Sequence, residues 1–434
     1  MHFKAKASAT LAVIAAAGLL LSGCTPAATG GDGGPVTLTI WHNTGDSDAV
    51  NKLYTAWEEK TGNKIELVNI PADAFESTTL TKWTAGDRPD VLEYHVAPSF
   101  LQQLNPTENM VDLTDEPFVA ASGDAYNTAG RGSDGKVYMA ITTFPETWGL
   151  YFNRNVLDDL GLEPATTFPE LQAQCATIKA AGIIPMNQAG GSNWPPTVMP
   201  LLYATSAAPD GWVEDVLAKK AKINDPDSPE LAGYNAWQSL KDAGCFNDDY
   251  TTSKFEDSAS RVYKGEAVYD MIHSNIAPVY LDAAGGDAAA LDAAVGFTAF
   301  GATEKETAVT YGPIGSFGVP KNDDPAKQAA ALDFVRFITG EGYAQYIADS
   351  GTFPIIDGAP NPENPSQLIL DIKAAYDEGP LVTLLGQRIP AGLGGNGGAF
   401  FQQFAVGQLT AQEVVDQLQE EFESAARAQG IEGF

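Results

Sequence analysis

Hydrophobic patterns typical of strands and of helices alternate over the first part of the chain. Apolar-rich runs at 36–41, 64–70 and 90–94 are typical of strands. Between them, apolar residues recur at helical spacing over 48–60 and 74–85. Strands and helices in alternation predict an α/β lobe built on a mostly parallel sheet.

A proline interrupts the next β-rich region at a position that suggests a change of sheet. The runs at 136–144 and 147–153 are joined through Pro145 and Glu146. Proline fixes φ and has no backbone N–H, so a hydrogen-bonded ladder cannot pass through it undisturbed. We expect the chain to leave one lobe here and to enter a second, with a cleft between the two.

Well-marked helices follow this crossing. A short helix is predicted over 155–161, and a longer one over 166–182 carries Thr and Pro at its start and Gly at its end. Leu171, Cys175 and Ile178 recur at i, i+4 and i+7, which gives the longer helix one apolar stripe. Amphipathic patterns predict two further helices, at 325–340 and 408–428.

The first residues have the pattern of an export signal. Residues 1–23 begin with a basic end, continue with an apolar core at 9–21, and finish with the small residues before Cys24. Leu-Ser-Gly-Cys after an apolar core resembles a bacterial lipoprotein signal, in which Cys24 becomes the lipidated first residue; the alternative is an ordinary signal peptide. Residues 24–35 are small, polar and rich in Gly and Pro, as expected of a flexible tether.

The predicted location follows from this signal. No later stretch approaches the roughly 20 apolar residues that a transmembrane helix needs. We therefore expect an exported protein on the outer face of the bacterial cell membrane, or facing the periplasm, which contacts the membrane only through its lipid anchor. The leaflet that holds the anchor stays open.

Length, charge and cysteine content add three constraints. Roughly 400 residues follow the tether, more than one hydrophobic core usually holds, which favours two lobes. The net charge of −31 argues against nucleic acid as a partner. Cys175 and Cys245 form an even pair in an oxidising compartment, which predicts a disulfide; the alternative is two buried free thiols.

The chain resembles extracellular solute-binding proteins of carbohydrate ABC importers, the group that includes maltodextrin-binding protein. Four stretches carry the resemblance in the same order along the chain: 37–45, 88–95, 135–171 and 314–355. The resemblance implies a two-lobed periplasmic-binding-protein-like α/β fold, in which helices flank a mostly parallel sheet in each lobe and a hinge joins the lobes. It implies a monomeric receptor that captures a sugar in the cleft and delivers it to the membrane subunits of an ABC permease.

The family fold also implies the division of the chain. The first lobe is expected to comprise 36–144 plus 318–370, and the second lobe 145–317 plus 371–434. The hinge is expected near Pro145, near Phe317 and near Leu370.

A sugar presents hydroxyls at its rim and C–H groups on its faces, so its receptor needs aromatic side chains together with polar ones. Positions after predicted strands, at the crossing and in a Gly/Pro loop fit this need and also match contact regions of the family. The predicted ligand-binding residues are Asn43, Thr44, Glu93, Tyr94, Glu146, Trp148, Trp194, His273, Asn275 and Phe401.

Several of these residues have a structural alternative. Tyr94 and Trp148 could equally belong to the core at sheet edges, and Glu146 could serve the hinge. Many family members carry a sugar-stacking tryptophan where this chain has 271–275, so His273 and Asn275 are expected to hydrogen-bond instead. That departure favours a small or polar sugar over a long stacked oligosaccharide.

Other functional classes find less support. A receptor of the same fold for peptides, polyamines or metal chelates remains open. A secreted glycoside hydrolase would need two carboxylates across the scissile bond, and with 56 acidic residues any pair could be nominated. The histidines show no metal-ligand spacing, and motifs of catalytic or cofactor sites are missing, so no enzyme activity, metal or cofactor is expected.

Overall fold

The structure is a computed structural model that describes residues 34–434, apart from 45, 47, 72–73, 124, 193, 304–307, 312–315, 379–380, 390–396 and 432. The predicted signal peptide, Cys24 and most of the tether lie outside the described residues. Within the described part of the chain, every helix is too short or too polar to cross a bilayer.

The first sheet has five strands in the order β2-β1-β3-β10-β4. They are β1 (Thr37–Asn43), β2 (Lys64–Ile70), β3 (Val91–Tyr94), β4 (Met139–Ile141) and β10 (Ser316–Gly318). β1 runs parallel to β2 and β3, whereas β10 runs antiparallel to β3 and β4. Four of the five strands therefore share one direction, as expected, and only β10, which returns from the other sheet, runs against them.

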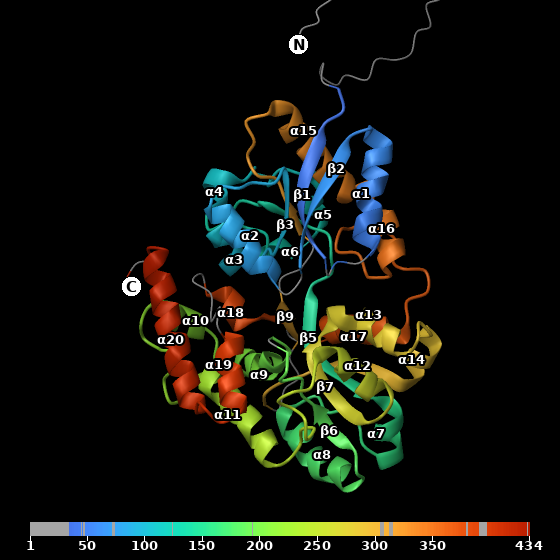
Figure 1. Cartoon of the computed structure of the whole chain (residues 1–434), viewed down its shortest axis with the longest axis vertical. Helices are drawn as coiled ribbons and strands as arrows, with labels where there is room; N and C mark the ends of the chain where they lie inside the picture. The colour runs from blue at the N-terminus through green and yellow to red at the C-terminus, as the bar shows by residue number, and fades with distance from the viewer. Residues whose placement is uncertain are drawn as a thin grey trace, which may run out of the picture. The chain divides into compact units, whose positions relative to one another are not determined.

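Helices cover the first sheet on both faces, as Figure 1 shows. The longer ones are α1 (Asp48–Thr61), α2 (Phe75–Thr84), α15 (Pro325–Ile338) and α16 (Tyr343–Ser350), and the short ones are α3 (Pro98–Gln103), α4 (Pro106–Asn109), α5 (Pro117–Ala121) and α6 (Ala125–Thr128). Trp57 in α1 is fully buried and donates from Nε1 to Asp333 of α15 at 2.9 Å. This bond joins the early and late parts of the sequence within one lobe.

The second sheet has six strands, in the order β11-β9-β5-β7-β6 with β8 paired to β5. They are β5 (Glu146–Asn153), β6 (Ile184–Asn187), β7 (Ala267–His273), β8 (Val295–Ala299), β9 (Ala308–Tyr311) and β11 (Leu381–Thr383). β5 is antiparallel to each of its neighbours, while β6 pairs with β7 and β9 with β11 in parallel. Five of the six strands therefore share one direction, and only β5 runs against them, so this sheet is also mostly parallel with one reversed strand.

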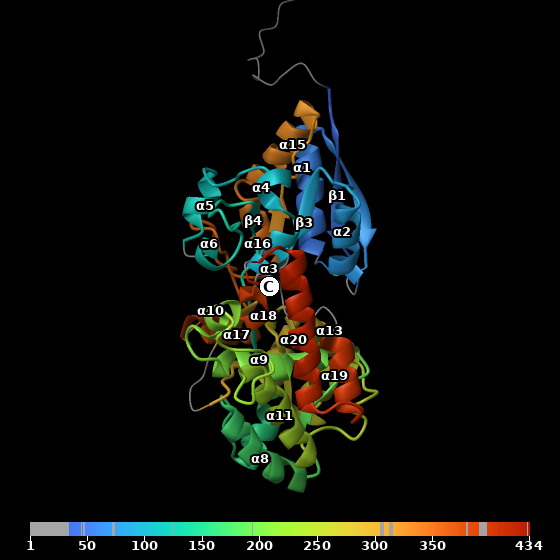
Figure 2. The same ribbon diagram turned by 90° about the vertical axis from the view of Figure 1, so that its left-hand side faces the viewer.

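The second lobe holds most of the helices (Figures 1 and 2). They are α7 (Arg154–Leu160), α8 (Phe168–Ala180), α9 (Val198–Ala207), α10 (Trp212–Leu217), α11 (Pro229–Asp242), α12 (Phe255–Tyr263), α13 (Ala277–Ala283), α14 (Ala288–Ala294), α17 (Gln367–Glu378), α18 (Leu385–Arg388), α19 (Gly397–Ala405) and α20 (Ala411–Ala428), with 3₁₀ turns at Pro195–Thr197 and Ser274–Ile276. α19 and α20 pack against one another, and α20 also packs on α11.

The buried apolar residues form one cluster in the first lobe, the first core, and two clusters in the second lobe, which together are called the second core. The first core draws its buried residues from 38–141 and 317–356, and the second lobe draws its own from 148–309 and 368–426. The chain therefore passes three times between the cores. Ser316 and Phe317 pair within the first sheet, and Leu368 packs in the second lobe, so these passages differ by a few residues from the predicted limits.

Local sequence signals account for several helix ends. In α8, Thr167 and Glu170 form a reciprocal capping box, which satisfies backbone N–H groups at the helix start. α7 ends at Gly161, which adopts φ 64°, a left-handed conformation that glycine reaches without a steric penalty. The apolar stripe predicted for α8 is buried, as its residues 171, 175 and 178 all lie in the core.

The structure contains the disulfide that the sequence predicts. Cys175 in α8 and Cys245 after α11 are bonded, with their Cα atoms 5.6 Å apart and a sequence separation of 70. Both cysteines are buried in the second core. The bond therefore links α8 to the segment after α11 within one lobe and does not cross between the lobes.

Removing this bond is expected to lower the free energy of unfolding of the second lobe. Closing a loop of about 70 residues contributes about 4 kcal/mol in the chain-entropy model. Replacing Cys175 and Cys245 with Ser should therefore lower the free energy of unfolding by about that amount, which appears as a lower denaturant midpoint. A reducing agent should shift the wild type in the same direction and leave the double variant unchanged; equal midpoints for oxidised wild type and variant would contradict the prediction.

Candidate functional site

Two neighbouring strands of the second sheet bring the predicted ligand-binding residues together. Glu146 and Trp148 lie at the start of β5, and His273 lies at the end of the antiparallel strand β7. Trp148 and His273 are register partners, with ring centroids 6.5 Å apart. Antiparallel pairing therefore places the first residues of β5 beside the last residues of β7.

The turn after β7 is held in place from behind. Ser274 accepts a hydrogen bond at Oγ from the backbone N–H of Thr147 at 3.0 Å and another at its carbonyl from the hydroxyl of Tyr151 at 2.9 Å. All three groups are buried. These bonds fix the orientation of the flanking residues His273 and Asn275.

Glu146 is the buried acid of this cluster. Its Oε1 accepts a hydrogen bond from Nδ2 of Asn275 at 2.7 Å, and its Oε2 lies 3.7 Å from Nδ1 of His273. Burial raises the pKa of Glu146 to about 8, and the negative charge of Glu76 in the first lobe adds to the effect. The carboxyl group is therefore mostly protonated at neutral pH, so it can donate one hydrogen bond and still accept others.

Trp194 covers His273 from outside. The two rings are stacked with centroids 4.7 Å apart, and Phe255 supports the indole from 5.4 Å. Trp194 is 41% exposed, unusual for so large an apolar side chain. Burial lowers the pKa of His273 to about 3, so its ring is neutral, and its Nδ1 has no hydrogen-bond partner among the described residues. The cluster thus combines an aromatic face with unused polar atoms.

The first lobe contributes a pair that the sequence analysis did not select. Nε2 of His95 lies 2.5 Å from Oε1 of Glu76, in α2. Burial alone would raise the pKa of Glu76, but the hydrogen bond and charge of His95 outweigh burial and lower the pKa. His95 follows β3, where a ligand contact could have been expected from the strand-end rule, whereas nothing in the sequence marks Glu76.

Three other predicted residues belong to the first lobe. Tyr94 is buried, with its ring 6.2 Å from that of Phe75 and 5.9 Å from that of Phe100. Asn43 is buried at the end of β1, and Thr44 is exposed after it.

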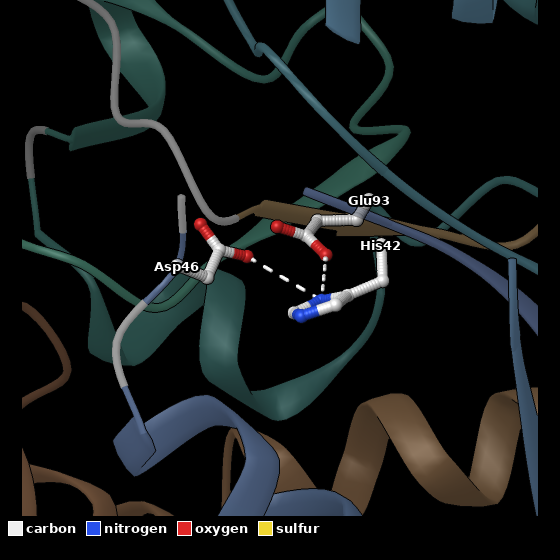
Figure 3. A group of neighbouring side chains, drawn as sticks. All are labelled: His42, Asp46 and Glu93. Carbon is white, nitrogen blue, oxygen red and sulfur yellow. Dashed lines mark hydrogen bonds and ion pairs between the residues drawn. The ribbon is translucent and has the colours of Figure 1, made fainter. Parts of the chain in front are cut away.

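The structure corrects the placement of two predicted ligand contacts. Phe401 is 0% exposed and packs edge-to-face on Trp237 inside the second core, because α19 turns its apolar face inward. Glu93 is 1% exposed, and its Oε2 lies 3.2 Å from Nδ1 of His42 (Figure 3). The hydroxyl of Tyr54 lies 3.3 Å from the same oxygen. The carboxylate of Glu93 therefore faces the interior of the first lobe.

Comparison with known proteins agrees with this architecture. A family model described as bacterial extracellular solute-binding protein matches residues 52–370, well over half of the chain. The chain belongs to this family of bacterial extracellular solute-binding proteins. The family is one of exported proteins, and the proteins compared below are binding proteins rather than enzymes.

The solute-binding protein is also similar to individual relatives. It is 27% identical over 164 residues to the melibiose/raffinose/stachyose-binding protein MelE of Bacillus subtilis, and this match spans 37% of each chain. A chitin oligosaccharide binding protein superposes with a TM-score of 0.76 at 19% identity, covering 91% of this chain and 100% of the other.

Two more solved structures share the fold. The solute-binding protein RafE in complex with raffinose gives a TM-score of 0.71 at 18% identity, over 90% of this chain and 99% of the other. A sugar transporter protein of Bacillus licheniformis in complex with stachyose gives 0.69 at 19% identity, over 90% and 100%. These likenesses establish the two-lobed fold of this solute-binding protein.

The raised pKa of Glu146 predicts a pH-dependent stability. A carboxyl group whose pKa is higher in the folded than in the unfolded state stabilises the fold at low pH, and this contribution is lost as pH rises toward the folded pKa. The free energy of unfolding should therefore fall by up to about 1.4 kcal/mol per pH unit between the ordinary glutamate pKa and about 8.

Glu146→Gln, which mimics the protonated acid, should remove this part of the pH dependence. Thermal or denaturant unfolding from pH 5 to 9 would measure it, with the variant gaining stability relative to wild type only as pH rises. Glu341→Gln makes the same substitution on an exposed side chain and serves as the control. Parallel curves for wild type and Glu146→Gln would contradict the assignment.

Proposed function

We propose that this protein is the receptor of an ABC importer that captures a sugar or small oligosaccharide between its lobes and delivers it to a membrane permease. The observation that carries the proposal is the exposed Trp194 stacked on His273, with Glu146 and Asn275 beside it. An aromatic face with donors and acceptors at its edge is the chemistry that recognises a sugar ring.

The charge state of the cluster supports an uncharged solute. Glu146 is mostly protonated at neutral pH, and His273 is neutral. A cationic solute such as a polyamine would be better matched by ionised carboxylates, because a buried charge needs a partner of opposite sign. A neutral polyhydroxyl solute can instead exchange hydrogen bonds with these groups in both directions.

The relatives point to the same class of solute. The curated relative is named for binding melibiose, raffinose and stachyose, and two of the similar structures hold raffinose and stachyose. The match covers only 37% of that relative, so the names of its solutes serve as a guide to the first ligands to test. Galactose-containing oligosaccharides are the first candidates.

The proposed mechanism is closure of the lobes about the three passages between the cores. A solute would bind one lobe first, and contacts from the other lobe would then favour the closed form. The packing of Phe144 on Tyr376, with centroids 4.5 Å apart, and the bond from Tyr343 Oη to the carbonyl of Thr142 at 2.9 Å lie beside the first passage. The domain limits that we propose are those predicted from the sequence, adjusted to the two cores.

One observation favours a second candidate, a glycoside hydrolase. Glu146 has a raised pKa and Glu76 a lowered one, the pattern of a general acid paired with an ionised carboxylate. The family and the similar structures are those of binding proteins, which favours the receptor. Turnover of each ligand is therefore measured in the same experiment as binding.

We expect melibiose, raffinose or stachyose to raise the thermal unfolding temperature of the purified protein and to bind with one site by calorimetry. Chitin oligosaccharides, maltodextrins, a polyamine and a peptide mixture complete the panel, and chromatography of each incubation detects cleavage. Stabilisation by a non-sugar alone would identify a different solute, and cleavage products would identify a hydrolase. Either result would overturn the proposal.

The same titration tests the site through its exposed aromatic residue. Trp194→Ala should weaken binding of the stabilising sugar at least tenfold, because the indole supplies the face on which the sugar ring packs. Trp194→Phe should recover part of the affinity. Val406→Ala removes an exposed apolar side chain elsewhere in the second lobe and should leave affinity unchanged. Unchanged affinity in Trp194→Ala would remove this residue from the site.

We further propose that the protein is held at the membrane through lipid on Cys24, as its leader sequence predicts. Wild type expressed in a bacterial host should incorporate a labelled fatty acid and fractionate with membranes. Cys24→Ser should abolish the label and release the protein into the soluble exported fraction or leave its leader uncleaved. Labelling of the variant would contradict the proposal.

A further inference from the structure

Three side chains outside the proposed sugar site converge within the first lobe. His42 is in β1, Asp46 is in the connection from β1 to α1, and Glu93 is in the neighbouring strand β3. The two carboxylates point toward one another, and both face the imidazole (Figure 3). The group combines one nitrogen ligand with two carboxylates.

The ligand atoms have the spacing of a metal site. Nδ1 of His42 lies 3.7 Å from Oδ2 of Asp46 and 3.2 Å from Oε2 of Glu93, and the three ligand atoms all lie within 4.8 Å of one another. Zinc holds nitrogen and carboxylate ligands at about 2.0–2.2 Å, which in tetrahedral geometry separates neighbouring ligand atoms by about 3.4 Å. One ion could therefore contact all three residues and keep a fourth position for water.

One oxygen of each carboxylate has no hydrogen-bond donor among the described residues. Oε1 of Glu93 and Oδ2 of Asp46 are buried and accept no hydrogen bond from the described residues. An unpartnered oxygen is unusual on a carboxylate as deeply buried as that of Glu93. Tyr54 donates to Oε2 of Glu93 at 3.3 Å, the kind of outer contact that orients a metal ligand. Two buried carboxylates that face each other repel unless a shared proton or a cation lies between them. A divalent cation between the three side chains would satisfy both carboxylates and the imidazole together.

We propose that His42, Asp46 and Glu93 bind a divalent transition-metal ion, of which zinc is the type. The imidazole ligand favours zinc and similar ions over calcium and magnesium, which prefer oxygen ligands alone. The ion would join β1, the connection that follows β1, and β3. It would thereby order the segment that carries Asn43 and Thr44 and stabilise the first lobe, whether or not the protein binds a sugar.

Sequence spacing does not predict this group, because the histidines show no metal-ligand spacing along the chain. Asp46 lies four positions after His42, but the third ligand, Glu93, lies 51 positions after His42. Only the pairing of β1 with β3 brings it close.

Calorimetry tests the proposal on tag-free wild-type protein, because a histidine tag would itself bind the probe. The protein is treated with a chelator, dialysed and titrated with zinc chloride, and its unfolding temperature is measured with and without zinc. We expect one high-affinity equivalent and a raised unfolding temperature. Asp46→Asn and His42→Gln should each weaken zinc binding at least tenfold.

Asp112→Asn is the matched control, since it removes one exposed carboxylate of the first lobe and should keep the high-affinity equivalent. This control accounts for non-specific binding to an acidic protein. Cobalt(II) added to wild type gives an independent test, because its visible spectrum reports ligation directly even if a variant fails to fold. Absence of a one-equivalent site, an equal site in Asp46→Asn, or stabilisation by calcium alone would overturn the proposal.

Discussion

Pairing of β5 on both edges is the constraint on which the second lobe and the candidate site depend. All eight residues of this strand are buried, with β7 on one edge and first β9 and then β8 on the other. The exchange of partners occurs at Gly149, where a Cβ atom would lie 2.2 Å from the carbonyl oxygen of Thr298. Because β5 begins directly after the first passage between the lobes, its register also positions Glu146 and Trp148 relative to His273 at the end of β7.

The cluster around Glu146 is preorganised by atoms that a solute would not touch. Ser274 receives hydrogen bonds from two residues of β5, and Tyr151, which supplies one of them, is itself stacked on Tyr280 at 4.2 Å. Tyr280 in turn donates to the buried carboxyl group of Asp270 at 3.1 Å. This chain of contacts fixes the turn that presents His273 and Asn275, so less ordering is left to be done when a ligand binds.

Sequence patterns were most informative where the physics is local. Helical spacing, caps and the Pro145 interruption predicted α1, α8 and the first change of sheet, since each depends on neighbouring residues. The one reversed strand of each sheet, β10 and β5, was not predicted, because its direction depends on how the chain passes between the lobes. Side-chain orientation was equally hard to predict. Glu76 was not expected beside His95, and Phe401 was expected at the ligand but lies in the second core. Tertiary packing, which sequence spacing does not reveal, decides both positions.

The three passages between the cores also affect biogenesis. The first core needs Phe317 and Ile356 in addition to its early strands, and the second needs α20 near the C-terminus. An emerging N-terminal fragment thus lacks the partners that would complete either core. Neither core can be completed without residues from late in the sequence, which is compatible with passage through a translocation channel before folding.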